Sequence, residues 1–164
     1  MSSIARTGEF DVPPLQDRYL EDYQEGTSYE FGSVTVSEEE VIEFARRYDP
    51  QPFHVDPEAA AGSPFGGLIA SGWHTGAMMM RLLADHFLSP VSSLGSPGID
   101  ELRWPAPVRP GDTLRLHVTI LENRRSRSKP DRGIVRTRVE LINQRDEPVL
   151  TLLAVNLVRT RPIG

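Results

Sequence analysis

Residues 73–88 form a helical pattern that is apolar on most sides. Its apolar members are Ala77, Met78, Met79, Met80, Leu82, Leu83 and Ala84. A helix of this kind has to be covered by other elements, so we expect a largely buried helix filled by plain core packing. Four later segments, residues 102–104, 113–123, 133–143 and 149–158, read as strands separated by turn signals. One buried helix followed by an antiparallel run that can wrap it predicts an α+β fold.

The first half of the chain predicts a strand and two helices. Residues 27–36 suggest a strand that is broken near Gly32. Ser37 and Glu40 form a capping box, which predicts the start of a helix. The helix stripe that follows, expected to be buried, consists of Val41, Phe44, Ala45 and Tyr48. Proline at 57 and the Gly-Ser-Pro at 62–64 bound a short helical turn over residues 57–61.

Length and composition predict one domain. The chain has 164 residues, of which 38% are hydrophobic and 25% charged, enough to build a core without cross-links. We expect a disordered tail at residues 1–17 and a single domain over residues 18–164. The absence of cysteine excludes disulfides, thiolate nucleophiles and cysteine-based metal sites, and is consistent with a cytoplasmic protein.

Charge and hydropathy exclude two classes of partner. A formal net charge of -5 argues against a protein whose main role is nucleic-acid binding. The start of the chain lacks an apolar core of signal-peptide length, and no stretch is long enough to cross a bilayer. We therefore expect a soluble protein without a membrane partner.

Two groups suited to acid–base chemistry lie close together at Asp49 and His54. Pro50 disfavours helix at Asp49 and should end the preceding helix there, while Pro52 should keep the path extended. At a helix C-terminus the dipole would slightly raise the proton affinity of a carboxylate, which suits a general base. The alternative interpretation makes Asp49 a turn former and His54 a histidine satisfied by backbone carbonyls.

Two motifs carry a resemblance to a known family. The run Asp-Pro-Gln-Pro-Phe-His-Val-Asp-Pro at 49–57 is followed by Phe65, Gly-Leu-Ile-Ala at 67–70 and Ser-Gly at 71–72. Together with Pro-Val-Arg-Pro-Gly-Asp-Thr-Leu at 107–114, these residues resemble the MaoC-like acyl dehydratases and R-specific enoyl-CoA hydratases. The resemblance extends from about Tyr19 to the end of the chain.

The resemblance implies a hot-dog fold, an antiparallel sheet wrapped around a long central helix, and assembly as a homodimer or larger homo-oligomer. It implies hydro-lyase activity on an acyl-CoA or acyl-carrier thioester. The chain departs from the family pattern at Tyr48, Gln51 and Phe53, where glycine, asparagine and an aliphatic residue are usual. These departures bear on the range of substrates more than on the Asp49–His54 pair.

Hydration of a 2-enoyl thioester needs a base, an acid and a donor for the thioester oxygen. Asp49 and His54 are candidates for the first two functions, acting together on one water. Gly72 is the third catalytic candidate, because an N–H at a helix start has no partner within the helix. A capping or packing glycine explains Gly72 equally well. We expect Ser71 to cap that helix and not to act as a nucleophile, since no Gly-x-Ser-x-Gly motif surrounds it.

The candidate substrate contacts are Gln51, Phe53, Ser71, Trp73, Arg125 and Arg127. For Trp73 and Trp104, core or interface packing is the simpler interpretation. Arg125 and Arg127 belong to a basic cluster that either forms a solvated hairpin loop or grips the phosphates of CoA.

We expect neither a metal nor a cofactor beyond the thioester substrate, since no histidine pair has a ligand spacing. The function predicted is thus that of an acyl dehydratase or R-specific enoyl-CoA hydratase. The alternatives are a hot-dog acyl-CoA thioesterase and a non-catalytic acyl-CoA binding subunit.

Overall fold

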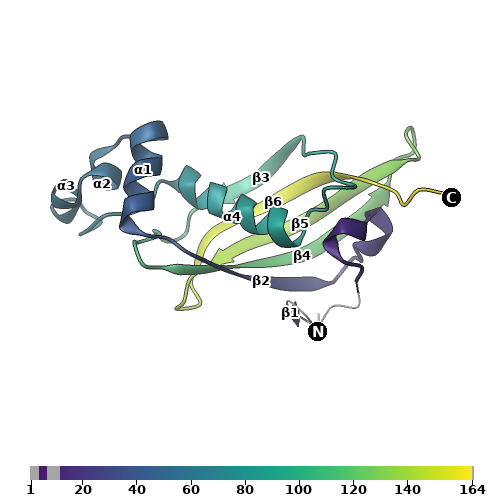
Figure 1. Cartoon of the computed structure of the whole chain (residues 1–164), viewed down its shortest axis with the longest axis horizontal. Coiled ribbons are helices and arrows are strands. Elements are labelled where there is room, and N and C mark those ends of the chain that lie inside the picture. The colour runs from purple at the N-terminus through teal and green to yellow at the C-terminus, as the bar shows by residue number, and fades with distance from the viewer. Residues whose placement is uncertain (1–3, 7–11, 164) are drawn as a thin grey trace.

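The computed structural model describes residues 4–6 and 12–163 and consists of one sheet with helices gathered around it (Figure 1). In chain order the strands and helices are β1 (Ile4–Arg6), β2 (Ser28–Thr35), α1 (Glu38–Tyr48), α2 (Pro52–Val55), α3 (Pro57–Ala61), α4 (Gly72–His86), β3 (Gly98–Arg103), β4 (Thr113–Arg125), β5 (Arg132–Ile142) and β6 (Pro148–Arg159). Two short 3₁₀ turns, Leu15–Asp17 and Leu20–Asp22, precede β2.

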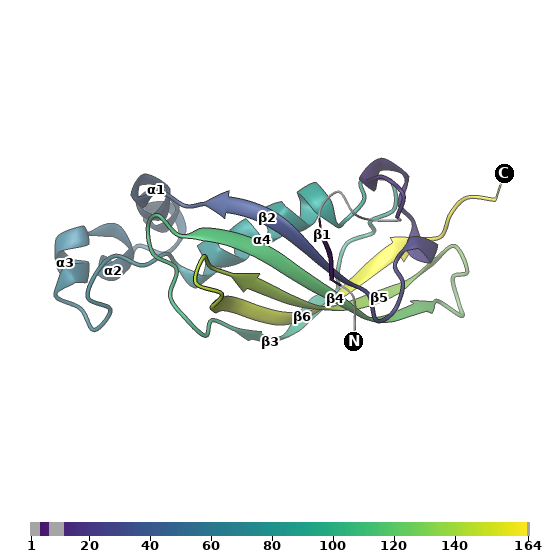
Figure 2. The same cartoon turned by 90° about the horizontal axis from the view of Figure 1, so that it is seen from below.

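The sheet has the strand order β1-β2-β4-β5-β6-β3. Every pairing is antiparallel except that of β1 with β2. The pairing of β2 with β4 shifts register between Gly32 and Val34, where the sequence predicts a break. The predicted α+β class and the sheet wrapped around a central helix are both confirmed, and Figure 2 shows α4 lying along the curved sheet.

Alternation along the strands builds the core. On β4, Leu114, Leu116, Val118 and Ile120 are all fully buried, and the residues between them are only partly covered. Successive side chains of a strand point to opposite faces, so this pattern presents one apolar face to α4. Met78, Leu82 and Leu83 of α4 and the following Phe87 join the same core cluster. Burial of this apolar face, at about 25 cal/mol per Å2, is the main term that holds α4 on the sheet.

The central helix is less buried than its sequence predicts. Trp73 is 63% exposed and Met80 is 45% exposed, and Ala77 and Ala84 are exposed as well. The reason is that the sheet of a single chain covers only one side of α4. The prediction of a largely buried helix is therefore wrong for the isolated chain, and an apolar stripe is left on its outer side.

The predicted α1 stripe is also only partly right. Val41 and Ala45 are buried, but Tyr48 is 64% exposed. Tyr48 stands in the last turn of α1, where its ring packs on Phe44 at a centroid distance of 5.2 Å and not in the core. The helix start is confirmed, since the Ser37 hydroxyl accepts a hydrogen bond from the Glu40 N–H.

Strand predictions for β4, β5 and β6 agree with the structure within two residues at each end. The third strand begins at Gly98, four residues before the predicted start at Leu102, and ends before Trp104. β3 lies at a sheet edge and five of its six residues are exposed, so it lacks the apolar alternation that marks the other strands.

Of the predicted disordered tail, residues 1–17, residues 1–3 and 7–11 lie outside the described residues. Of the described part, Ile4–Arg6 pair with β2, and Leu15–Asp17 form a 3₁₀ turn. Asp17 forms an ion pair of 2.8 Å with Arg161, which ties this turn to the end of β6. In the part of the chain that the structure describes, none of the helices is long and apolar enough to span a bilayer.

Candidate active site

Helix α1 delivers Asp49 to the end of the molecule where α2 and α3 also lie (Figure 1). Asp49 is the C-cap of α1, and its N–H donates to the Ala45 carbonyl at 2.7 Å. Pro50 follows directly and stops the helix, as the sequence predicts. The carboxylate therefore leaves the helix at a fixed position.

His54 lies on the one-turn helix α2, which begins at Pro52. The prediction that Pro52 keeps the chain extended is wrong, because proline at the first helical position is preorganised for a helix. The ring is buried, and Nδ1 lies 2.7 Å from the Ile69 carbonyl oxygen. Because a carbonyl can only accept, Nδ1 carries a proton and donates it, which leaves Nε2 as the atom that can gain or lose one.

Asp49 and His54, called the dyad below, are in direct contact. His54 Nε2 lies 3.3 Å from Asp49 Oδ2. The same Oδ2 accepts a hydrogen bond of 2.7 Å from the Ser71 hydroxyl, and Oδ1 accepts one of 2.7 Å from the Gln51 amide. Both carboxylate oxygens are thus held by separate donors, which fixes the orientation of the group.

The contacts of Asp49 set its proton affinity. Burial alone would raise the pKa of Asp49, but the hydrogen bonds from Ser71 and Gln51 and the charge of His54 lower it below its ordinary value. The sequence predicted a slightly raised affinity from the helix dipole. That prediction is wrong, because three direct contacts outweigh a terminal dipole.

Helix α4 begins beside the dyad. Ser71 is its N-cap and is fully buried, and its Oγ accepts a hydrogen bond of 3.3 Å from the Trp73 N–H. The predicted capping role is confirmed, and Ser71 has the further role of donating to Asp49. Gly72 is the first helical residue, and in residues 12–163 its N–H has no acceptor.

Trp104 packs against Gly72. Its indole Nε1–H donates to the Gly72 carbonyl at 3.0 Å, and a Cβ added to Gly72 would lie 2.6 Å from the Trp104 ring. Glycine is therefore required at this position by the close approach of the indole. Trp73 meets the same ring edge-on at a centroid distance of 5.4 Å.

These groups border a cavity of about 380 Å3. Asp49, Gln51, His54, Gly72 and Trp73 all line it. Two further candidates contact the dyad without lining the cavity. The Ser71 hydroxyl donates a hydrogen bond to Asp49, and the Phe53 ring packs edge-on against the His54 ring at a centroid distance of 4.5 Å. All seven candidates outside the basic cluster thus either line the cavity or contact Asp49 or His54.

The structure does not bring every candidate to this cavity. Arg125 and Arg127 lie at the tip of the β4–β5 hairpin, at the opposite end of the long axis of the molecule (Figures 1 and 2). From Thr113 to Arg125, β4 alone covers roughly 40 Å at about 3.3 Å per residue. The two arginines therefore cannot reach a small group that is bound between Asp49 and His54 of the same chain.

Sequence reasoning missed part of the cavity wall. Trp104, Ala106 and Val108 line the cavity, and Ile69 both lines it and accepts the hydrogen bond from His54. The Ala70 N–H donates to the Val108 carbonyl at 2.8 Å, which joins the segment before α4 to the turn that enters β4. The available signal was the spacing of the two motifs at 49–57 and 107–114, which the fold brings side by side.

The groups at the cavity are suited to proton transfer. In the described residues, no group of three or more histidine, aspartate or glutamate side chains is placed to hold a metal ion. A carboxylate, an imidazole with one nitrogen free to exchange a proton, and an unpaired amide donor face one cavity. Together they can move protons and stabilise a developing negative charge.

Comparison with solved structures identifies the fold. The MaoC-like dehydratase from Rhodospirillum rubrum superposes with a TM-score of 0.83 and 43% sequence identity, covering 89% of this chain and 99% of that one. The sheet around α4 is thus a hot-dog fold, as the sequence resemblance implied.

Two relatives carry names of enzymes. A 3-hydroxyacyl-thioester dehydratase Z from Mycobacterium tuberculosis is 42% identical over 90 residues, which cover 54% of this chain and 60% of that protein. The aligned segment therefore spans less than two thirds of the length of this relative. A 3-hydroxybutyryl-CoA dehydratase from Methylorubrum extorquens is 32% identical over 113 residues, covering 68% of this chain and 69% of that protein.

The family model described as MaoC like domain matches residues 22–143, which include the dyad, the start of α4 and the turn into β4. The match covers well over half of the chain. With the cavity, the fold and these relatives in agreement, the chain belongs to the MaoC-like dehydratase family.

Proposed function

We propose that the protein is a hydro-lyase that adds water to a 2-enoyl thioester, or removes it from the 3-hydroxyacyl thioester, through Asp49 and His54. The observation that carries this proposal is the 3.3 Å contact between His54 Nε2 and Asp49 Oδ2 at the wall of the cavity. The thioester is proposed to be an acyl-CoA, which is the substrate class in the name of the Methylorubrum relative.

The dyad acts on a single water in this proposal. Asp49 Oδ2 and His54 Nε2 lie 3.3 Å apart and both residues line the cavity, so one water can contact both atoms. The pair removes a proton from that water as its oxygen attacks C3 of the enoyl group, and the pair returns a proton to C2. Because the two groups are coupled, base and acid roles belong to the pair and not to one residue.

The hydrogen bonds around the dyad support this role. The Ile69 carbonyl fixes the tautomer of His54, and Ser71 and Gln51 hold the carboxylate in its ionised form. The ionised carboxylate can accept a proton, and Nε2 of the imidazole can exchange one. Because these hydrogen bonds fix the positions of Asp49 and His54, the two side chains need not reorganise during the reaction, which would otherwise raise the activation barrier.

Gly72 is proposed to stabilise the thioester oxygen. Its N–H is at the positive end of α4 and has no acceptor in residues 12–163. As negative charge develops on the thioester oxygen, a hydrogen bond from this N–H becomes stronger than in the ground state. No cofactor is needed for this sequence of steps.

A homodimer is the proposed state of assembly. The edge strand β3 is exposed, and so are Trp73 and Trp104 at the cavity and Met80 further along α4. Exposed sheet edges and apolar patches of this kind are usually covered by a partner. A second copy paired along β3 would cover both.

An assay with crotonyl-CoA tests the function. Loss of the enoyl absorbance without release of free thiol is the expected result. Release of free thiol would instead identify a thioesterase, and binding without either change would identify a non-catalytic acyl-CoA subunit. Asp49→Asn is the matched control, since it keeps the shape of the side chain and removes its charge.

A further inference from the structure

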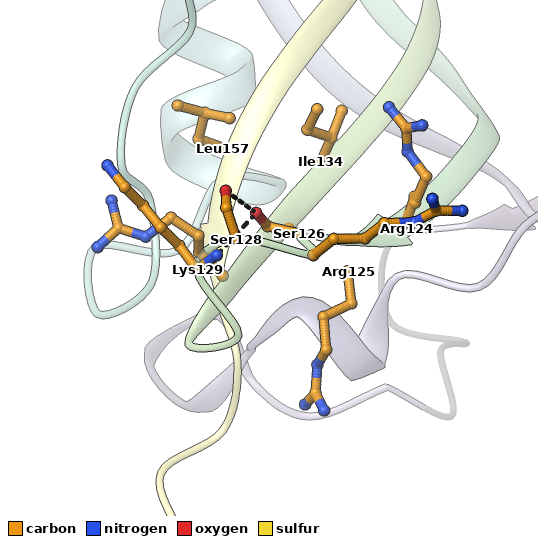
Figure 3. A pocket seen from close by; sticks show the side chains of 10 residues that line it. Arg124, Arg125, Ser126, Ser128, Lys129, Ile134 and Leu157 are labelled. Carbon is orange, nitrogen blue, oxygen red and sulfur yellow. Dashed lines mark hydrogen bonds between the residues drawn. The ribbon is translucent and has the colours of Figure 1, made fainter.

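The tip of the β4–β5 hairpin carries a dense group of positive charges. We call Arg124, Arg125, Arg127, Lys129 and Arg132 the basic tip; they border a cavity of about 480 Å3 (Figure 3). The chain as a whole is acidic, with a formal net charge of -5. The basic tip is therefore a local exception to the charge of the molecule.

Two charges of the basic tip are not neutralised. Arg124, Arg125 and Arg132 each have an acidic partner, namely Glu122 at 3.5 Å, Glu21 at 3.4 Å and Asp131 at 3.0 Å. In the part of the chain that the structure describes, Arg127 and Lys129 have no acidic group within 4.0 Å. Free cations on a surface of this kind attract an anion.

The other residues that line the cavity indicate which kind of anion it can bind. The hydroxyls of Ser126 and Ser128 face each other at 3.4 Å (Figure 3). Hydroxyls can donate to phosphate oxygens. Ile134 and Leu157 supply an apolar wall on the neighbouring strands, against which a flat base can pack. Cations, hydroxyls and an apolar wall together fit a nucleotide with phosphate groups.

The basic tip is at the wrong end of the molecule to serve the dyad of its own chain. The dyad lies at the end formed by α1, α2 and α3, whereas the basic tip lies at the other end of β4 (Figures 1 and 2). If two copies pair antiparallel along β3, the two-fold axis is perpendicular to the strands and the long axes of the two copies run in opposite directions. In such a dimer the basic tip of one copy points toward the same end of the assembly as the dyad of the other.

The edge strand β3 is suited to such a dimer. Its outer edge has no partner among the described strands. It carries Asp100 and Glu101 followed by Arg103, so an antiparallel copy would set acidic residues of one strand near the arginine of the other. Opposite charges across an antiparallel pair favour this self-association over a parallel one.

We infer that the basic tip binds the nucleotide phosphates of a CoA thioester whose acyl group is held at the dyad of a second copy of the chain. This inference rests on the proposed function for the identity of the thioester. The pantetheine arm of CoA separates its phosphates from its thioester, as a site shared by two chains requires.

Direct binding tests the phosphate site without catalysis. Adenosine 3′,5′-bisphosphate is titrated into the protein and into Arg127→Ala with Lys129→Ala, and heat is measured. We expect the double variant to bind about tenfold or more weakly, since one hydrogen bond to a charged group is worth at least about that factor. Arg138→Ala with Arg145→Ala, which removes two exposed arginines elsewhere, is the control for net charge and should bind as the wild type does. Equal affinity of all three proteins would overturn the inference.

Mixed dimers test whether the site acts across two chains. Two copies with different tags are expressed together and purified through both tags. In the first dimer, one copy carries Asp49→Asn and the other carries Arg127→Ala with Lys129→Ala. In the second dimer, one copy carries all three substitutions and the other is wild type.

Each mixed dimer has one active dyad, so the two differ only in which basic tip is intact. If the tip serves the partner, KM for crotonyl-CoA stays at the wild-type value in the first dimer and rises in the second. The reverse result would assign the tip to its own chain, and equal KM values, or a monomer in sedimentation, would also overturn the inference. Failure of the proposed function gives a different result, because the wild-type dimer would then not hydrate crotonyl-CoA, or the Asp49→Asn homodimer would keep full activity.

Discussion

The two ends of this molecule hold their charged groups in opposite ways. At the dyad end, both oxygens of Asp49 are hydrogen-bonded and His54 is buried. At the basic tip, Arg127 and Lys129 are exposed and have no ion-pair partner in residues 12–163. Folding has already fixed the geometry at the first end, and it has left charge free for a ligand at the second. Substitutions at the dyad end should therefore change the rate of the chemical step, and substitutions at the tip should change binding.

The largest effect is expected from the dyad itself. Asp49→Asn and His54→Ala should each lower kcat by about 10² to 10⁴-fold, because each removes one half of an acid–base pair. Steady-state hydration of crotonyl-CoA measures the change, and circular dichroism checks that the fold is intact. Near wild-type rates in both variants would contradict the proposed site.

The double variant sharpens this test. Since the two groups act on one water, Asp49→Asn with His54→Ala should be little slower than the poorer single variant. Losses that multiply would instead indicate independent roles.

Gly72 should give the next largest effect. A side chain at Gly72 would collide with Trp104, so the test is made in a Trp104→Ala background. There, Gly72→Pro lacks the N–H and Gly72→Ala keeps it. Loss of this donor should lower kcat by about 10² to 10³-fold in the proline variant relative to the alanine variant. Equal kcat values in two folded proteins would remove Gly72 from the mechanism.

At the basic tip the expected effect is a several-fold change in KM. Raising the ionic strength should raise KM for crotonyl-CoA, because salt screens exposed charges, and should leave KM for the phosphate-free pantetheine thioester unchanged. Arg127→Ala with Lys129→Ala should flatten the response more than Arg125→Ala, since Arg125 is already paired with Glu21. If KM for the two substrates responds equally to salt, the hairpin is a solvated loop that does not bind the phosphates of CoA.

The smallest effect is expected for Ser71→Ala, which leaves both dyad residues in place. The hydrogen bond from Ser71 helps to lower the pKa of Asp49, so its loss should raise that pKa and shift the acid limb of kcat/KM to higher pH. Loss of the helix cap should also reduce the free energy of unfolding by about 1 kcal/mol. The pH profile and urea unfolding measure the two changes, and Ser71→Thr, which keeps a hydroxyl, is the control.

The pH dependence of stability follows from the same shift. The folded-state pKa of Asp49 is lower than its ordinary value of 3.8. Its contribution to stability is therefore complete above that value and is lost as the pH falls through the lower pKa of the folded state. Ser71→Ala should lose less stability than the wild type between neutral and strongly acidic pH.

Local sequence patterns predicted the features that depend on neighbouring residues. The capping residues Ser37 and Ser71, the helix stop at Pro50 and the strands around Leu116 or Val139 are all decided within a few positions. The hot-dog arrangement was predicted from the family motifs. The periodic pattern alone would not distinguish a hot-dog fold from another sheet that wraps a helix.

Features that depend on contacts between distant residues could not be predicted. Trp104 lies on Gly72, 32 positions away, and the Ser71 hydroxyl reaches Asp49 across 22 positions. The exposure of Tyr48 and of one side of α4 depends on how far the sheet extends, and this is not encoded in the periodicity of either helix.

The Ser71 hydroxyl makes two hydrogen bonds, one to Asp49 and one from the Trp73 N–H, and this limits the residue types that position 71 can accommodate. Serine, threonine, asparagine and aspartate are all good residues at a helix N-cap. Aspartate would set a second carboxylate against Asp49, and glycine or alanine would leave Asp49 without its donor. Only residues that both accept from the Trp73 N–H and donate to Asp49 satisfy the two demands. Sequence drift at position 71 should accordingly be confined to side chains with a hydroxyl or an amide.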